Sequence, residues 1–485
     1  MQKRFRWNLP IVPIAIALAI AMNSANVAAA GPLLPTFPIG AAAYTVNVDE
    51  PDGNPGYVFY TTGLSAAVTV PEQVSALPTA APANVIVDKS GREVWRYTPP
   101  PGQGVSNFRT QLYQGKPVLT WWQGTSNGGH GSGVDYIADD HYRVIETLTP
   151  GGGLSSDVHE FRLTPDGHAL ITSYKEVTAD LSPVGGPKNG EMLDCIASVV
   201  DVATKKVLFA WDAMQHVPLT DTVMNYGPLA TAITTYDPYH MNAISLDPQG
   251  NLLISFRGTS TIYDVDAHTG TVDWQLGGKH SSFTMGPGVA FAGQHDAEFA
   301  DSSTIRLFDN NVEGVVPQGL SSLQWISLDY RRHTATLVRN QTHPAGLVTF
   351  ATGNAQALPK GDTFASWGTA PHISEVSPSG DLLYDASLPL GTYRAFFDPW
   401  TGHPVDRPRL TFTGGSAHAV WNGATGVARW RLLHGDDERN LLPQSVTEWA
   451  GIDTTIPAGH APGSYRIQAL DSAGAVVGES DTVRA

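Results

Sequence analysis

Apolar and polar residues alternate along short segments through most of the chain, with turn residues between the segments. In "MNAISLDPQGNLLISFRG", residues 241–258, two such runs flank the tetrapeptide Asp247-Pro248-Gln249-Gly250. Alternation with a period of two is typical of half-buried β-strands, and a Pro- and Gly-containing turn between two such runs predicts a β-hairpin. The chain also has 49 Gly and 35 Pro without a three-residue period, which fits many strands joined by tight turns. We therefore predict an all-β fold.

One type of hairpin recurs six times along the chain, as an alternating strand, a turn and a second strand that often ends in Trp. The copies are "ANVIVDKSGREVWRY", "VDYIADDHYRVIETL", "ASVVDVATKKVLFAW", "STIYDVDAHTGTVDWQL", "LQWISLDYRRHTATLV" and "HISEVSPSGDLLYDA". Another hairpin precedes five of them, in "NFRTQLYQGKPVLTWWQG", "HEFRLTPDGHALITSY", "MNAISLDPQGNLLISFRG", "HDAEFADSSTIRLFDN" and "GNAQALPKGDTFASWG", and the first copy has the weaker "PGYVFYTTG". Two hairpins per repeat, at irregular periods of roughly 50 residues, are typical of four-stranded propeller blades. The pattern predicts a six-bladed β-propeller over residues 55–400.

The pattern changes after the last repeat. In "RLTFTGGSAHAVWNGATGVARWRLL" and "YRIQALDSAGAVVGES", alternating strands and turn residues occur at the spacing of a sandwich, which predicts a small Ig-like C-terminal β-sandwich over residues 405–485. Residues 31–54 are predicted to be an N-terminal lead-in with one strand, "AYTVNVD", and no recognisable chemistry.

The first 30 residues have the pattern of a signal peptide. Lys3, Arg4 and Arg6 precede an apolar run over residues 9–22, and "ANVAAA" supplies small residues at cleavage spacing. The apolar run is shorter than the roughly 20 residues that a transmembrane helix needs, so an uncleaved anchor is the less favoured alternative. We expect an exported protein, periplasmic or secreted, with no membrane span after cleavage.

Charge and cysteine content narrow the possible partners. The net charge is −16 at pH 7, and it becomes −19 when the three cations of the signal peptide are removed. An acidic surface of this kind repels phosphate backbones and anionic lipids, so nucleic acids and membranes are not expected partners, and an anionic substrate needs a local cationic pocket. The only cysteine, Cys195, cannot form an internal disulfide.

Polar residues fall at corresponding positions of successive hairpins. When the first hairpins are aligned on their turns, one position is occupied in turn by His159, Asn242, His295 and Gly353. If the first strand of each blade lines the propeller axis, these residues lie at one height around the central channel. The alignment therefore predicts that side chains from adjacent blades converge there.

The hairpin of residues 236–260 adds two basic groups to this position. His240 and Arg257 are expected to face each other across the hairpin, with Asn242 on the same face by strand alternation. An imidazole beside a guanidinium is destabilised unless an anion lies between them. We therefore predict an anion site formed by donor side chains without an acidic residue in the same strand register, a set that suits sulfate or phosphate: His159, His240, Asn242, Arg257 and His295.

The segments that carry these residues, "DVHEF", "YHMNAI", "SFRG" and "QHDAEF", with "STIYDVDAHTGTVDWQLGGK" between them, resemble the bacterial PAPS-independent arylsulfate sulfotransferases, which work without a nucleotide sulfate donor. The resemblance runs through the whole predicted propeller, includes "NFRTQLYQGKPVLTWWQG" and "WNGAT", and is strongest to the less characterised branch of secreted proteins. It implies a ping-pong transfer of a sulfuryl group from an aryl sulfate donor to a phenolic acceptor, without a cofactor.

The resemblance also implies roles for individual residues. His295 matches the family's nucleophile, which forms a transient sulfohistidine. His159, His240 and Arg257 match residues that hold the sulfuryl oxygens, and Asn242 matches a neighbouring donor. Imidazole is a good neutral nucleophile near pH 7, and a second histidine, His240 or His159, would move the phenolic proton.

The chain departs from the well-studied members of this family in two respects. Those proteins carry an N-terminal β-sandwich used in pairing and can contain a disulfide, whereas here the additional domain is predicted at the C-terminus and there is one cysteine. The oligomeric state and the role of the C-terminal domain are therefore left open.

Other functions are compatible with the same pattern. A non-catalytic secreted propeller could use the pocket to bind a sulfated or phenolic ligand or a cell-surface partner. Three imidazoles could ligate zinc, although an adjacent Arg is a poor neighbour for a dication, so no metal is expected. The segment "DVDAHTGTVDW" is also similar to repeats of quinone-dependent dehydrogenase propellers, in which Trp residues dock the blades; blade packing explains these Trp residues equally well.

Four further residues allow a functional or a structural interpretation. Trp121 and Trp122 could stack on an aromatic substrate or belong to the core. The histidines outside the predicted site, including His130 in "GGHGSG" and His372 in "PHISEV", are interpreted as loop or strand-end residues.

Overall fold

The structure is a computed structural model that describes residues 43–51, 53–63, 81–227, 231, 235–458 and 461–485. These residues form strands β1 to β36 and four 3-10 helices of three residues each: Ser182–Val184, Ala213–Gln215, Leu219–Asp221 and Pro359–Gly361. The predicted all-β class is confirmed. The predicted signal peptide and the first part of the lead-in lie outside the described residues.

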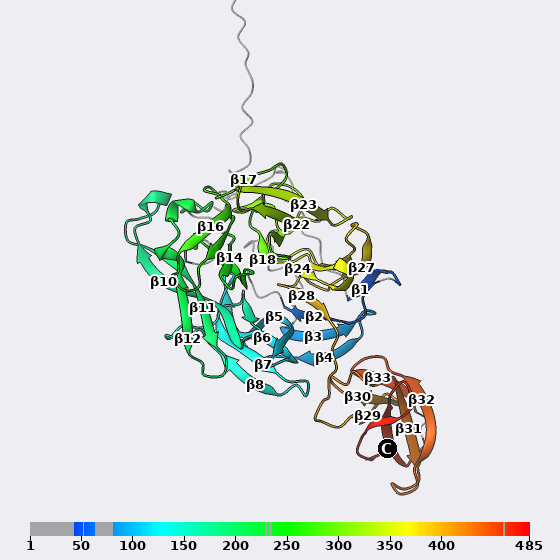
Figure 1. Cartoon of the computed structure of the whole chain (residues 1–485). Coiled ribbons are helices and arrows are strands. Elements are labelled where there is room, and N and C mark those ends of the chain that lie inside the picture. The colour runs from blue at the N-terminus through cyan, green and yellow to red at the C-terminus, as the bar shows by residue number, and fades with distance from the viewer. Residues whose placement is uncertain (1–42, 52, 64–80, 228–230, 232–234, 459–460) are drawn as a thin grey trace, which may run out of the picture.

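Six sheets of four or five strands lie around a common centre in the described part of the chain (Figure 1). The first sheet contains, in order, β28 (Ala395–Asp398), β2 (Tyr57–Thr62), β3 (Ala83–Asp88) and β4 (Glu93–Tyr97). The second contains β5 (Gly104–Tyr113), β6 (Lys116–Asn127), β7 (His130–Ala138) and β8 (Val144–Leu148). The third contains β9 (Phe161–Leu163), β10 (His168–Ala179), β11 (Gly190–Asp201) and β12 (Val207–Asp212).

The other three sheets continue around the centre. The fourth contains β13 (Met241–Leu246), β14 (Leu252–Phe256), β15 (Thr261–Val265) and β16 (Val272–Gly277). The fifth contains β18 (His295–Phe299), β19 (Thr304–Asp309), β22 (Ser322–Asp329), β23 (Thr334–Thr342) and the parallel β17 (Thr284–Met285). The sixth contains β24 (Asn354–Ala357), β25 (Thr363–Ser366), β26 (His372–Val376), β27 (Leu382–Ser387) and β1 (Thr45–Asp49). A short hairpin, β20 (Val312–Glu313) and β21 (Val316–Pro317), extends from the fifth.

Every repeated hairpin expected from the sequence is present. The Trp-ending repeats form β3–β4, β7–β8, β11–β12, β15–β16, β22–β23 and β26–β27, and the preceding segments form β5–β6, β9–β10, β13–β14, β18–β19 and β24–β25. The first strands of neighbouring sheets contact one another, as β13 does with β18 and β24 with β28. These strands therefore line the centre of the ring, where the sequence places the candidate site.

Two segments complete the ring of six sheets through strand pairings that the repeated hairpin pattern does not predict. The segment "PGYVFYTTG" forms β2, which pairs on one side with β3 and on the other with β28, about 340 residues further along the chain. The lead-in strand β1 pairs with β27 and forms the edge of the sixth sheet. The first sheet is thus built from both ends of the ring.

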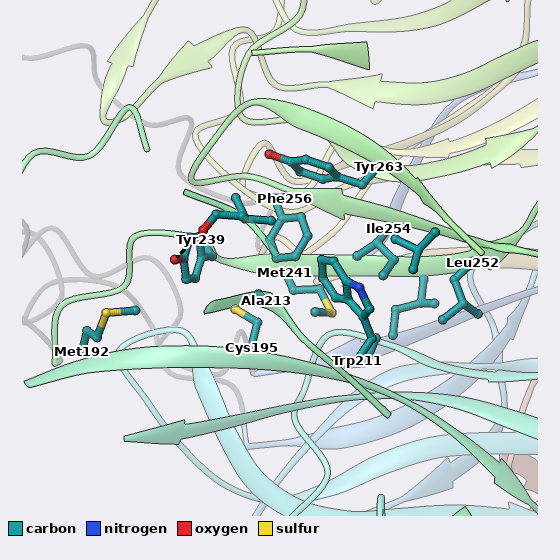
Figure 2. Close-up of a cluster of buried hydrophobic side chains, with 14 of the residues drawn as sticks. Met192, Cys195, Trp211, Ala213, Tyr239, Met241, Leu252, Ile254, Phe256 and Tyr263 are labelled. Atoms are coloured by element: carbon teal, nitrogen blue, oxygen red, sulfur yellow. Dashed lines mark hydrogen bonds between the residues drawn. The ribbon is translucent and has the colours of Figure 1, made fainter. Parts of the chain in front are cut away.

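Buried apolar clusters join neighbouring sheets. The cluster in Figure 2 combines Trp211 and Cys195 from the third sheet with Met241, Ile254 and Phe256 from the fourth. Trp211 is 1% exposed, and its indole N–H donates to the carbonyl of Gly270 at 2.9 Å. Burial of a large apolar side chain stabilises a fold by about 1.5–3 kcal/mol, so packing between sheets accounts for Trp211 in its repeat.

Trp121 and Trp122 also belong to the core. Trp121 stacks on Tyr136 with ring centroids 5.1 Å apart, and the indole N–H of Trp122 donates to the Ser156 carbonyl at 2.8 Å. A Cβ atom at Gly133 would lie 2.7 Å from the Trp122 ring, so glycine is needed there for the close approach. The structural interpretation of both residues is the one that their contacts support.

After β28 the chain forms two further sheets. One contains β29 (Arg409–Thr413), β30 (Ser416–Val420) and β33 (Asp453–Pro457), and the other contains β32 (Leu442–Glu448), β31 (Arg429–Gly435), β34 (Ser464–Leu470), β35 (Val476–Glu479) and β36 (Val483–Arg484). Side chains from both sheets form one core, which includes Leu410, Ala419, Trp430, Ile456 and Tyr465. In the described residues, no helix has the length and apolarity to cross a bilayer.

A buried arginine links the inner strands at the centre of the ring. Arg394, directly before β28, is fully buried and donates to Glu160 Oε2 at 2.9 Å and to the Asn242 carbonyl at 3.1 Å. It also lies 3.4 Å from Asn107 Oδ1 and 3.6 Å from Asp296 Oδ1. Burial opposes the ionisation of Glu160, but Arg394 and Arg109 outweigh it and lower its pKa. Arg394 therefore contacts residues of four other sheets.

We expect Arg394→Met to lower the free energy of unfolding by about 3–5 kcal/mol, because it leaves Glu160 buried without this partner. Chemical denaturation followed by Trp fluorescence measures the change. The control is Arg332→Met, which removes an ion pair whose arginine is 78% exposed and should cost less than about 1 kcal/mol. Equal effects of the two substitutions would contradict the role given to Arg394.

Candidate functional site

The four basic residues predicted from the sequence meet above the inner strands. His159 directly precedes Glu160, His240 precedes β13, His295 begins β18, and Arg257 follows β14. The rings of His159 and His240 lie 4.9 Å apart. The charges of Arg257, His240 and His159 all act on His295, and a Cβ atom at Gly293 would lie 3.8 Å from Arg257 Cγ. Three neighbouring sheets thus bring these side chains to one place.

The pairing of His240 with Arg257 follows the expected hairpin register, but Asn242 does not follow strand alternation. Met241 pairs with Phe256, and the Arg257 N–H donates to the His240 carbonyl at 2.9 Å. The register then shifts between Met241 and Ala243, so Asn242 lies in a β-bulge. Its Nδ2 donates to the Gln294 carbonyl at 2.7 Å. This hydrogen bond connects the fourth sheet to Gln294, the residue before His295. It uses the amide group of Asn242 that was expected to serve as a substrate donor.

His295 is held in one tautomer. The side chain is 1% exposed, and its Nδ1 lies 2.6 Å from Asn310 Oδ1 and 3.1 Å from the Gly293 carbonyl, two groups that only accept hydrogen bonds in this arrangement. The proton must be on Nδ1, and the lone pair is on Nε2, where the Thr352 N–H donates at 3.2 Å. Burial and the charges of Arg257, His240 and His159 hold the pKa of His295 well below its usual value. The imidazole is neutral at pH 7 and has its lone pair on Nε2.

His159 and His240 have aspartate partners that the sequence analysis did not include. Nδ1 of His159 contacts Asp157, and Nδ1 of His240 lies 2.5 Å from Asp237 Oδ2. The sequence analysis considered acidic residues in the same strand register only, and these aspartates lie outside it, in the turns before the strands. The backbone N–H of each histidine also donates to its aspartate, at 3.1 Å for His159 and 2.9 Å for His240. The spacings "DVH" and "DPYH", typical of such turns, were the available signal.

His130 is a strand-end residue, as interpreted from the sequence, but it also lies in the same group of side chains. It begins β7, and its Nε2 lies 3.1 Å from Asp237 Oδ2. Its ring centroid lies 5.2 Å from that of His240 and 4.4 Å from that of Tyr174. The glycines of "GGHGSG" gave no indication of these contacts. His372 instead pairs with Asp385 in the sixth sheet, Nδ1 to Oδ1 3.4 Å.

Arg257 is the one guanidinium of the predicted set, and it is incompletely bonded. Its Nη2 donates to the Gly314 carbonyl at 2.9 Å, and its Nε is buried without a hydrogen-bond partner among the described residues. Gly314 belongs to the turn of the β20–β21 hairpin. Arg257 therefore retains donor capacity beside His295.

His159, His240 and His295 do not form one group of possible metal ligands in the described part of the chain. Within the described ranges, three groups of side chains bring possible ligand atoms within 4.8 Å of one another, and none of them combines His159, His240 and His295. The group that includes His240 contains His130 and Asp237, and the 2.5 Å separation between His240 Nδ1 and Asp237 Oδ2 is that of a short hydrogen bond. The geometry combines a neutral imidazole with its lone pair on Nε2, a guanidinium and carboxylate-paired imidazoles, a set that could bind an anionic group.

Comparison with known proteins gives one family and several distant structural likenesses. The sequence pattern of a family described as arylsulfotransferase (ASST) matches residues 109–388. No curated protein sequence matches the chain. A protein of unknown function from Bacteroides caccae has a TM-score of 0.42 and 13% identity over 70% of this chain and 98% of that one.

A periplasmic gluconolactonase from Pseudomonas aeruginosa has a TM-score of 0.36 and 11% identity over 83% of this chain and 100% of that one. A Lactobacillus plantarum protein has a TM-score of 0.37 and 12% identity, with the same shares covered. At these TM-scores, none of the structural likenesses supports a statement about this chain.

The low pKa of His295 predicts how stability depends on pH. The unfolded chain takes up a proton at His295 as the pH falls through about 6.5, whereas the folded protein does not. The contribution of His295 to the free energy of unfolding is therefore present above pH 6.5 and is lost as the pH falls below it. His295→Gln should therefore lose less stability than the wild type between pH 7 and 5, by up to about 1.4 kcal/mol per pH unit. Denaturation at each pH measures this. His280→Gln, at a side chain 68% exposed, is the control and should keep the wild-type slope; an equal slope in His295→Gln would contradict the prediction.

Proposed function

Because the chain belongs to the arylsulfotransferase (ASST) family, we propose that it transfers a sulfuryl group from an aryl sulfate to a phenol through a transient sulfohistidine at His295. The observation that carries this proposal is the fixed tautomer of His295. Its Nδ1–H donates to Asn310, and its Nε2 keeps the lone pair, which accepts the Thr352 N–H at 3.2 Å, in a group of side chains that includes Arg257, His159 and His240.

In the first half-reaction, the Nε2 lone pair of His295 leaves its hydrogen bond with the Thr352 N–H and attacks sulfur. The N–S bond forms as the bond between sulfur and the aryl oxygen breaks, and the aryl oxygen leaves with the bonding electron pair as a phenoxide. Arg257 and the Nε2–H of a doubly protonated His159 donate to the sulfuryl oxygens, whose negative charge persists through a loose transition state. Asp157 keeps the Nδ1 proton of His159 in place. Removal of one such preorganised donor typically costs about 3 kcal/mol.

In the second half-reaction, the oxygen of an acceptor phenol attacks sulfur and the N–S bond breaks. The phenolic proton passes to Nε2 of His240, and His295 regains its lone pair with the Nδ1–H···Asn310 bond unchanged. Burial lowers the pKa of His240 to about 4 against the opposing charge of Asp237, so His240 is a free base at neutral pH. Its side chain is 18% exposed, against 4% for His159, which favours His240 over His159 as the residue that meets an incoming phenol.

The same proposal covers the architecture around the site. The six sheets are the blades of a six-bladed β-propeller over residues 55–400, and the two C-terminal sheets are a β-sandwich over residues 405–485. Residues 1–30 are a signal peptide, so the chain is exported and meets aryl sulfates and phenols outside the cytoplasm.

Purified protein should release nitrophenol from 4-nitrophenyl sulfate at a rate that increases with added phenol, and His295→Ala should lose that release. Absorbance of nitrophenol measures the rate, and mass spectrometry of rapidly quenched protein should find one SO₃ group on the peptide that contains His295. His280→Gln is the matched histidine control and should keep wild-type activity. If the wild type shows no phenol-dependent release, the protein is instead a propeller that uses this pocket to bind a ligand.

Arg257→Met should lower kcat/KM for 4-nitrophenyl sulfate about 100-fold, because a charged donor to the sulfuryl oxygens is lost. The control is Arg332→Met, which should leave kcat/KM unchanged, because the Arg332 side chain is 78% exposed. Steady-state kinetics with both variants measures the difference. A kcat/KM within a factor of two of the wild type for Arg257→Met would exclude Arg257 from sulfuryl binding.

A further inference from the structure

Asp237 lies between two imidazoles that come from different sheets. Its Oδ2 lies 2.5 Å from Nδ1 of His240 and 3.1 Å from Nε2 of His130, and its Oδ1 accepts the backbone N–H of His240 at 2.9 Å. The carboxylate is 8% exposed, and the His130 side chain is 11% exposed. A carboxylate that accepts from both nitrogens requires a proton on Nδ1 of His240 and on Nε2 of His130.

This arrangement places the lone pair of His240 on Nε2, the atom that receives the phenolic proton in the second half-reaction. Nδ1 of His130 has no hydrogen-bond partner among the described residues, so the contact with Asp237 is the polar contact that fixes its ring. Tyr174 packs against the His130 ring, with 4.4 Å between the two centroids.

We propose that His130 and Asp237 are positioning residues that keep His240 neutral and in its Nδ1–H form, so that Nε2 is free to accept the proton of an incoming phenol. This role rests on the sulfuryl transfer proposed above, whereas the hydrogen-bonded group of three side chains does not depend on it. His130 does not touch the substrate; it acts on His240 through Asp237.

The charges around the group support this division of roles. An isolated aspartate would draw a proton onto His240, because an opposite charge favours the protonated imidazole. Asp237, with Asp157, outweighs burial and raises the pKa of His130. The charge of His130 in turn opposes protonation of His240. The charged and titratable groups that interact with the three side chains from the surrounding elements are Asp157, His159, Arg257, Tyr174, Cys195, Tyr236 and His295.

The proton balance follows from these positions. Before the acceptor binds, Asp237 carries a negative charge that raises the pKa of His130, and His240 is neutral. When the acceptor oxygen forms its bond to sulfur and the His295–sulfur bond breaks, the phenolic proton moves to Nε2 of His240. The resulting imidazolium keeps its Nδ1–H bond to Asp237 and then loses the Nε2 proton to solvent.

His130→Gln tests the proposal, since glutamine keeps an N–H donor for Asp237 but has no charge. The pKa of His240 should rise by about one unit or more, because Asp237 then acts on His240 alone. Histidine ¹⁵N NMR titration reads this pKa and the tautomer without reference to activity. His280→Gln is the control and should leave the His240 titration unchanged. An unchanged titration of His240 in His130→Gln overturns the proposal.

Kinetics give the second readout. The acidic limb of the pH profile for phenol-dependent turnover should move upward in His130→Gln by the same amount, while the first release of nitrophenol from 4-nitrophenyl sulfate keeps its wild-type pH dependence. An equal shift of the pH dependence in both half-reactions would contradict the proposal that His130 acts only through His240. If the wild type transfers no sulfuryl group, the proposed function fails, and the NMR titration still decides whether His130 controls the protonation of His240.

Asp237→Asn provides an independent variant in case His130→Gln does not fold. It removes the carboxylate that fixes both imidazoles, so the pKa values of His130 and His240 should fall together, and His240 should become a mixture of Nδ1–H and Nε2–H forms in the NMR spectrum. Retention of a pure Nδ1–H form would overturn the role of Asp237.

Discussion

The fold and its centre depend on one buried cation. Arg394 contacts Glu160, Asp296, Asn107 and the backbone of Asn242, so the last segment of the ring is bonded to strands of four other sheets. Buried carboxylates such as Glu160 are stable only when a partner compensates their charge, and the inner strands bring several of them to one place. The same contacts fix the backbone of Asn242, whose amide in turn holds the carbonyl of Gln294 directly before His295. The geometry of the candidate nucleophile is thus connected to the closure of the ring.

The elements of this fold were largely predictable, because hairpins are local. Each repeated hairpin has its alternation and its turn within about 20 residues, which is the range over which periodicity and turn chemistry act. The pairing of β2 with β28 and the addition of β1 to β27 were not predictable in the same way, since no local pattern specifies a partner strand hundreds of residues away. The bulge at Asn242 was missed for a related reason: strict alternation was assumed across a point where one extra residue shifts the register.

The candidate site was partly predictable. The turn alignment and the family resemblance led to His159, His240, Arg257 and His295, which the structure brings together, because these residues are attached to regular strands. Asp157 and Asp237 lie in the preceding turns, where the register argument did not reach. His130 comes from another sheet, and only the packing of sheets around the centre places it beside Asp237. These additional groups determine the tautomers of the imidazoles, on which the proposed chemistry depends.

The pairing of β2 with β28 also has a consequence for how the protein is made. During synthesis, β2 emerges long before the strand that completes its sheet, and Arg394 is added after every residue of the histidine group. Non-local pairings of this kind slow folding, because the entropy of closing a long loop is lost before the contacts form. A nascent chain that ends before residue 394 therefore has neither a closed ring nor the bonds that hold the Asn242 backbone. Maturation of the pocket is expected to be a late and cooperative event, reached only by the full-length ring.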